Sequence, residues 1–128
     1  MKYSFSRNDR LAGKKNIEHL FTSGQRLSIG TLRFLWIANS AGDKAGVKIA
    51  ISVSKKLHKK AVDRNKIRRR IREAYRIRKK EILEAAIAMH SEIHIMIIYY
   101  STEIMSYDVI AEWIKTAMQR IQEKLCKK

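Results

Sequence analysis

Lysine and arginine are concentrated in one stretch of the chain, residues 55 to 80. This stretch contains half of the 28 basic residues, opposed only by Asp63 and Glu73. Arginine predominates in its middle, and a guanidinium group can bind two oxygens of a phosphate at once or stack on a nucleobase. The residue types therefore indicate a localised surface that binds a polyanion.

The spacing of apolar residues predicts that the basic stretch is one long helix, from Ala61 to about Met89. Apolar side chains recur every three or four residues and form a narrow seam of Ile67, Ile71, Ala74, Tyr75, Ile82 and Ala86. Away from the seam, Arg64, Arg68 and Arg72 form a ridge, which is broadened by Lys66, Arg69, Arg70 and Arg76. Like charges four residues apart destabilise an isolated helix by roughly 0.2–0.5 kcal/mol per pair. An anionic partner explains this ridge better than the simpler alternative, a solvated basic face.

Asn65 is unusual within this helix, because asparagine favours helix ends over helix interiors. It stands between Arg64 and Lys66. Two interpretations remain open from the sequence. Asn65 caps the first turn, or its amide binds a phosphate, a ribose or a base edge of a nucleic acid.

The composition supports a folded, strongly basic protein. The net charge is +16 and the pI is about 10.3, while apolar residues make up 45% of the 128 residues. Such a chain is long enough for one domain, which we expect to span residues 1–128, and too apolar to be a disordered basic tail. The charge favours nucleic acid as the partner, ahead of an acidic membrane surface or an acidic protein.

Several features point to a cytoplasmic, soluble protein. The single cysteine, Cys126, excludes an internal disulfide and is compatible with a reducing compartment. The first residues lack the apolar segment of a secretory signal. The longest apolar run, residues 95–100, is too short to span a bilayer.

The rest of the chain predicts an α/β (α+β) two-layer sandwich. Residues 9–22 read as an amphipathic helix whose core side chains are Leu11, Ile17, Leu20 and Phe21. Residues 26–38 read as one strand or, divided at Gly30, as two, and residues 47–54 alternate as a half-exposed strand. Residues 92–100 are apolar enough for a strand covered on both faces.

Ser106 is placed to cap a last helix, whose core stripe is Val109, Ile110, Trp113, Ile114, Ala117, Ile121 and Leu125. The predicted order is helix, two or three strands, long helix, strand and helix. The strand–helix–strand passage through the basic helix allows a parallel pair within the sheet.

Signals for chemistry carried by the protein itself are weak. His90 and His94 flank Glu92, but they fall where a helix gives way to a strand, so we expect ordinary histidines there and no metal site. Cys126 is expected to be incidental. The large aromatic residues are expected in the core unless an exposed strand face presents them: Phe34, Trp36, Tyr99, Tyr100 and Trp113.

The stretch "SVSKK", followed by "AVDRNKIRRRIREAYR", resembles the bacterial ribonuclease P protein subunit. Arg64-Asn65, then Ile67-Arg68-Arg69 and Ile71-Arg72, match that family's pattern of Arg-Asn followed by basic residues and an aliphatic seam. The resemblance implies a partnership with a large catalytic RNA. That RNA, with bound Mg²⁺, hydrolyses a phosphodiester bond in precursor tRNA to release the mature 5′ end.

The family's residue roles carry over to two sets of positions. The resemblance implies that the catalytic RNA is bound, one protein per RNA, by Arg64, Asn65, Lys66, Arg68, Arg69, Arg70, Arg72 and Arg76. It implies that the single-stranded 5′ leader of precursor tRNA lies between the first helix and the sheet, against Phe21, Ser52, Ser54, Lys55, Lys56, Arg33 and Trp36. It also implies the order α-β-β-β-α-β-α and a mixed, four-stranded sheet with a left-handed strand–helix–strand crossover, against the usual rule.

Two departures from the family pattern concern these surfaces. Ile17 stands where related proteins often have a second aromatic residue. The link between Lys56 and the basic helix, "LHKK", is longer by one residue than the family's common form. Two other classes remain as alternatives: a non-catalytic RNA-binding protein of the ribosomal type, and a DNA-binding protein. Against the second, no helix-turn-helix or leucine-zipper spacing adjoins the basic helix.

Overall fold

The computed structural model describes residues 11, 13–40 and 44–126. Its elements follow the predicted order, with three helices and four strands: α1 (Lys14–Ser23), β1 (Gln25–Ile29), β2 (Leu32–Ser40), β3 (Gly46–Val53), α2 (Ala61–Ala88), β4 (Ser91–Tyr99) and α3 (Tyr107–Cys126). In this part of the chain, no helix is apolar over a length sufficient to cross a membrane.

The four strands form one mixed sheet in the order β1-β2-β4-β3. Strands β1 and β2 are antiparallel, as are β2 and β4, whereas β3 and β4 are parallel. The parallel pair is the one joined through α2, which confirms the predicted mixed sheet. The hand of this crossover stays a prediction.

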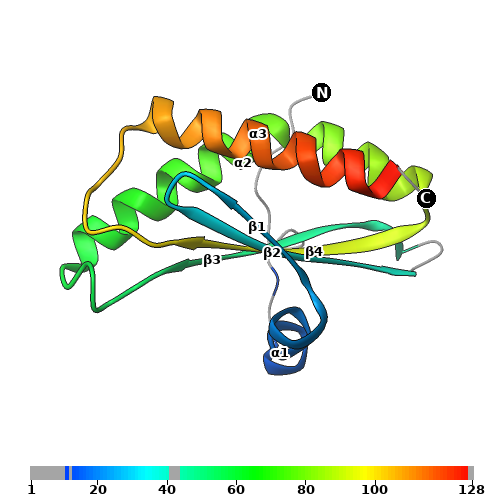
Figure 1. Cartoon of the computed structure of the whole chain (residues 1–128), viewed down its shortest axis with the longest axis horizontal. Helices are drawn as coiled ribbons and strands as arrows, with labels where there is room; N and C mark the ends of the chain where they lie inside the picture. The colour runs from blue at the N-terminus through cyan, green and yellow to red at the C-terminus, as the bar shows by residue number, and fades with distance from the viewer. Residues whose placement is uncertain (1–10, 12, 41–43, 127–128) are drawn as a thin grey trace.

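Helices cover both faces of the sheet (Figure 1). Helices α2 and α3 lie together on one face, and α1 lies alone on the opposite face. The two faces bury separate apolar clusters. The larger one includes Phe34, Ile49, Ile95 and Tyr75 beneath α2 and α3. The smaller one contains Leu11, Leu20, Leu35 and Met96 beneath α1. The predicted two-layer sandwich thus gains α1 as partial cover on its second face.

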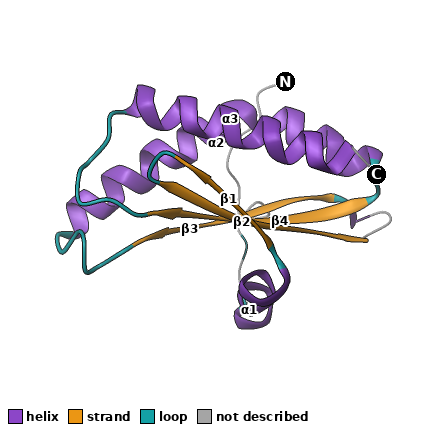
Figure 2. Ribbon diagram, viewed as in Figure 1, coloured by secondary structure: helices purple, strands orange, loops and turns teal. Residues whose placement is uncertain are grey.

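Both faces of β4 are covered by helices, as its apolar sequence predicted. Ile93, Ile95, Ile97 and Tyr99 are buried beneath α2 and α3, and Met96 is buried on the α1 side. Strand β4 is also paired along both edges, so it lies at the centre of the molecule (Figure 2).

The long helix has nearly the predicted bounds and the predicted seam. Ile67, Ile71 and Ile82 are fully buried on the sheet side. In α3 most of the predicted stripe is buried, but Val109 is exposed and Trp113 is half-buried. Val109 lies in the first turn of α3, whose start is bonded to Ser106: the backbone N–H of Val109 donates to Ser106 Oγ at 3.4 Å.

Helix α1 begins at Lys14, later than predicted, and the expected start of the helix lies partly outside the described residues. Leu11 precedes it, is buried, and donates its backbone N–H to the carbonyl oxygen of Ile49 at 2.7 Å. The prediction that Phe21 faces the core is wrong, because this side chain is 46% exposed. Leu20 occupies the buried position, and the next residue on a helix points about 100° away from it.

The turn between β1 and β2 depends on Gly30. Its φ angle of +57° lies in the left-handed region, and an added Cβ would overlap the indole ring of Trp113. Gly30→Ala is therefore expected to lower the free energy of unfolding by about 2 kcal/mol or more. Urea denaturation measures this. Gly46→Ala is the matched control, because nothing lies within 4 Å of its Cβ position, and its effect should stay within about 0.5 kcal/mol. Equal effects of the two changes would contradict this role for Gly30.

Candidate nucleic-acid interface

The outward face of α2 is formed by Asn65, Arg69 and Arg72, which are exposed. Arg64 and Arg68 are partly buried. Two of the three arginines in the ridge predicted from the sequence are therefore less exposed than Asn65 and Arg69. Within the described chain, no hydrogen bond or ion pair engages the side chains of Asn65, Arg68 or Arg69. These groups are available to an external partner.

The structure excludes one of the two interpretations of Asn65. The N-cap of α2 is Lys60, and no side chain caps this end. Asn65 lies more than one turn into the helix, and its exposed amide makes no capping bond there. Capping is therefore excluded as the reason for an asparagine at this position.

Arg64 has a contact within the protein. Its Nη1 donates to the carbonyl oxygens of His58 and Lys59, at 2.9 and 3.0 Å. These carbonyls belong to the loop that precedes α2. The first arginine of the ridge thus fixes the loop "LHKK", the segment in which the sequence departs from the common family form.

Arg70 fixes a second loop. Its Nη1 donates to the carbonyl oxygen of Met105, 35 residues away, in the segment between β4 and α3. Lys66, Arg69, Arg70 and Glu73 line a hollow beside Tyr107 at the start of α3. One side of the basic surface is therefore built against α3.

Arg76 is paired with a carboxylate on its own helix. Its Nε and Nη2 donate to the two oxygens of Glu73 at 3.0 and 2.6 Å. This hydrogen-bonded pair lowers the pKa of the Glu73 carboxyl and raises the pKa of the Arg76 guanidinium. Arg76 is consequently less available to an external anion than Arg69.

A second candidate surface lies on the face of the sheet that carries α1. The strand register aligns Ser52, Ile98, Arg33 and Ser28 across β3, β4, β2 and β1. The neighbouring row contains Leu35 and Met96, which α1 covers through Leu20. The row that contains Ser52 and Arg33 therefore borders α1. Phe21, a residue of α1, exposes its ring to solvent.

Ser54, Lys55 and Lys56 follow β3 in a tight turn. The backbone N–H of Lys56 donates to Ser54 Oγ at 3.2 Å, and the N–H of His58 donates to the carbonyl oxygen of Ser54 at 3.0 Å. Ser54 therefore shapes the turn, and both lysine side chains are exposed. The turn joins the second surface to the start of α2.

Trp36 does not belong to this surface, which corrects the prediction that it contacts the leader. Its side chain is 3% exposed and packs in the larger core beneath α2 and α3. In β2, residues alternate between faces, so Trp36 shares the buried side with Phe34, while Arg33 points to the α1 side. The same alternation that predicted the strand predicts this separation.

Two residues at the end of the sheet, beside the second candidate surface, were not among the predicted site residues. His58 is 5% exposed, and its Nε2 donates to the carbonyl oxygen of Ser101 at 2.6 Å. Tyr100 is 55% exposed, whereas the sequence placed it in the core. For Tyr100 the available signal was its position directly after a strand, where alternation places it opposite the buried Tyr99.

The sequence profile described as Ribonuclease P matches residues 5–122. The chain belongs to this family. Among curated relatives, the ribonuclease P protein component of Chlorobaculum tepidum is 40% identical over 85 residues, which cover 64% of this chain and 54% of that protein. The Porphyromonas gingivalis component is 32% identical over 77 residues, covering 60% and 56%. The matched region thus spans about half the length of these relatives.

Solved structures of the Ribonuclease P family share the fold. The Staphylococcus aureus RNase P protein superposes with a TM-score of 0.69 at 22% identity, covering 88% of this chain and 94% of that one. The Thermotoga maritima RNase P protein gives a TM-score of 0.70 at 22% identity, covering 87% and 98%. At this identity the similarity establishes the fold, including the mixed sheet.

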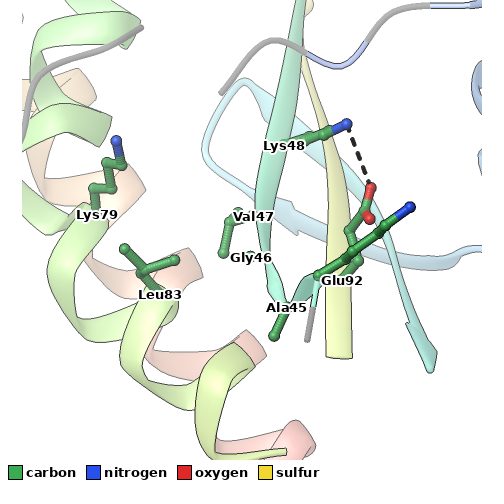
Figure 3. Close-up of a pocket in the computed structure, with 8 residues that line it drawn as sticks. Ala45, Gly46, Val47, Lys48, Lys79, Leu83 and Glu92 are labelled. Atoms are coloured by element: carbon green, nitrogen blue, oxygen red, sulfur yellow. Dashed lines mark ion pairs between the residues drawn. The ribbon is translucent and has the colours of Figure 1, made fainter. Parts of the chain in front are cut away.

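The end of the sheet opposite Ser54 and Tyr100 carries a hollow of about 240 Å³, lined by residues of both charges (Figure 3). Lys48 lies 3.7 Å from Glu92, and His94 Nε2 lies 2.7 Å from the same carboxylate oxygen. These contacts, that of His94 above all, lower the pKa of Glu92. His90 is exposed at the end of α2. No three His, Cys, Asp or Glu side chains of the described chain gather as metal ligands.

The two roles of arginine in α2 can be separated by stability. Arg70→Ala removes the bond to the carbonyl of Met105, and we expect the free energy of unfolding to fall by about 1–2 kcal/mol. Arg69→Ala is the matched control, because this neighbouring side chain is exposed and makes no hydrogen bond or ion pair in the described chain. Its effect should stay within about 0.5 kcal/mol. Urea denaturation of both variants measures the difference, and equal stabilities would exclude the anchoring role of Arg70.

Proposed function

We propose that this chain is the protein subunit of a ribonuclease P holoenzyme, in which it acts as one RNA-binding domain. It binds the catalytic RNA and the 5′ leader of precursor tRNA, and so assists the endonucleolytic hydrolysis that matures the 5′ end of tRNA. Family membership supports the assignment to ribonuclease P. The division into two RNA surfaces is supported by the placement of the side chains.

The exposed face of α2 is the observation that carries the proposal. Asn65, Arg68 and Arg69 have no protein partner within the described chain, and Arg72 is exposed beside them. With Lys66 they present a row of donors suited to the phosphates of a structured RNA, which binds largely through its backbone and shape. Arg64, Arg70 and Arg76 support this row through the loops and Glu73, and retain further N–H donors for phosphate.

The leader is proposed to follow the second surface, along the border of α1. Phe21 offers an exposed ring, and Arg33, Lys55 and Lys56 offer positive charge. Ser52 adds a hydroxyl within the same row. Aromatic stacking and backbone charge bind single strands with little dependence on sequence. This suits a protein that must accept the leaders of many precursor tRNAs.

Catalysis is assigned to the RNA partner. No three His, Cys, Asp or Glu side chains gather as metal ligands in the described part of the chain. Following the resemblance to the ribonuclease P protein subunit, we place Mg²⁺ on the RNA and expect one protein per RNA. The protein positions the substrate and neutralises phosphate charge.

The contribution of the arginines can be measured from the salt dependence of binding. Arg68→Ala and Arg72→Ala each remove one phosphate contact, so the slope of log affinity against log salt should decrease in magnitude by roughly 0.7–0.9 per substitution. Filter binding to the catalytic RNA across a salt series gives this slope. Arg120→Ala, an exposed arginine on α3, is the control and should leave it unchanged. Wild-type slopes for both α2 variants would remove them from the interface.

Reconstitution tests the function itself. Adding the protein to the naked ribonuclease P RNA should lower the Mg²⁺ concentration needed to process precursor tRNA. The reason is that lysine and arginine side chains of the bound protein neutralise phosphates that Mg²⁺ would otherwise have to neutralise. The protein alone should cleave nothing. An unchanged Mg²⁺ requirement would favour the ribosomal-type alternative. Clean 5′ processing by the protein without RNA would overturn the assignment of catalysis to the RNA.

A further inference from the structure

Tyr100 is a large aromatic residue left exposed at the end of the central strand. Its neighbour Tyr99 is fully buried on the α2 and α3 side, whereas Tyr100 is 55% exposed. The side chains of an extended strand alternate between faces, so Tyr100 lies toward the face that carries α1. An exposed tyrosine at this position covers no core.

Arg33 stacks on the ring of Tyr100. The guanidinium carbon lies 4.5 Å from the ring centroid, within the range of a cation–π contact. Arg33 is itself exposed, and its register places it in the row of Ser52 and Ile98. Arginine and tyrosine together thus form a flat, positively charged platform, and the tyrosine keeps more than half of its surface open.

The backbone around Tyr100 is held on both sides. The N–H of Tyr100 donates to the carbonyl oxygen of Thr31 at 3.0 Å, which extends the ladder between β2 and β4 by one bond. The next residue, Ser101, accepts the hydrogen bond from the buried His58. A ring fixed in advance loses less conformational entropy when a ligand stacks on it.

We propose that Tyr100, backed by Arg33, is a stacking site for one unpaired nucleobase of the precursor-tRNA leader; this rests on the proposed function. The ligand class follows from the chemistry of the site. Its aromatic face accepts any base by stacking, and the adjoining guanidinium favours a polyanionic strand. The exposed Lys55 and Lys56 lie at the same end of the sheet, after the strand end that pairs with Tyr99. With Ile17 in α1 instead of a second aromatic residue, Tyr100 supplies a second exposed ring in addition to Phe21.

The test uses the reconstituted holoenzyme and precursor tRNAs that carry 2-aminopurine at one leader position at a time. Stacking on a tyrosine ring changes the fluorescence of this base analogue. In the wild-type complex we expect one leader position to be quenched relative to its neighbours. Tyr100→Ala should relieve the quenching at that position, and Tyr100→Phe should retain it because the ring is preserved. A residue with only a structural role would not produce a signal confined to one nucleotide.

Affinity provides the second readout. Tyr100→Ala should weaken binding of a precursor with a long leader by about 5- to 100-fold, and leave binding of a precursor with a one-nucleotide leader unchanged. Ile87→Ala is the matched control, because Ile87 is 53% exposed near the end of α2, away from both surfaces. It should behave as wild type with both substrates. Thermal denaturation verifies that all variants are folded.

The outcomes separate the two proposals. If the wild-type holoenzyme binds long-leader and one-nucleotide precursors equally, the leader surface of the proposed function fails. If the wild type prefers the long leader but Tyr100→Ala keeps that preference and the quenching pattern, only the stacking site fails. Loss of the preference in Tyr100→Ala, with its recovery in Tyr100→Phe, supports the site.

Discussion

Strand β4 is paired along both edges and packed against helices on both faces, so its peptide groups and its apolar side chains leave water together. Burial of this kind requires that every N–H and C=O has a partner within the sheet, and β2 and β3 provide them. Because β3 runs parallel to β4, the chain must cross from one end of the sheet to the other between them. The crossover element is α2. The most basic helix of the protein is thus also the connection that completes its core.

This connection explains how a helix with so many like charges remains folded. Ile67, Ile71 and Tyr75 are fully buried, and burial of such side chains contributes roughly 1.5–3 kcal/mol each. Repulsion between arginines one turn apart is several-fold smaller. The Glu73 carboxylate also neutralises the charge of Arg76, and loop carbonyl oxygens stabilise the guanidinium groups of Arg64 and Arg70 by accepting hydrogen bonds. The remaining charge faces outward and is concentrated near the start of α2.

Periodicity predicted most of this architecture, because burial of an amphipathic element fixes its side-chain pattern. The order of elements, the long helix and the fully covered strand were all predicted, as was the parallel pair. Side-chain roles were predicted less well. Trp36 is buried on one face of the sheet and Arg33 is exposed on the other, because side chains alternate along a strand, and this alternation was visible in the sequence. The bonds from Arg70 to Met105 and from His58 to Ser101 join residues 35 and 43 positions apart, and no local pattern reports such contacts.

Among the residues that the structure describes, β3 has a sheet neighbour on one side only, and the carbonyl of Ile49 in this strand accepts a hydrogen bond from the backbone N–H of Leu11. An unpaired strand edge is a template for another chain, and natural proteins block such edges. Leu11 occupies one acceptor on this edge and buries its side chain beside it. The segment ahead of α1 thus blocks part of an edge at which the strand of a second molecule could otherwise pair.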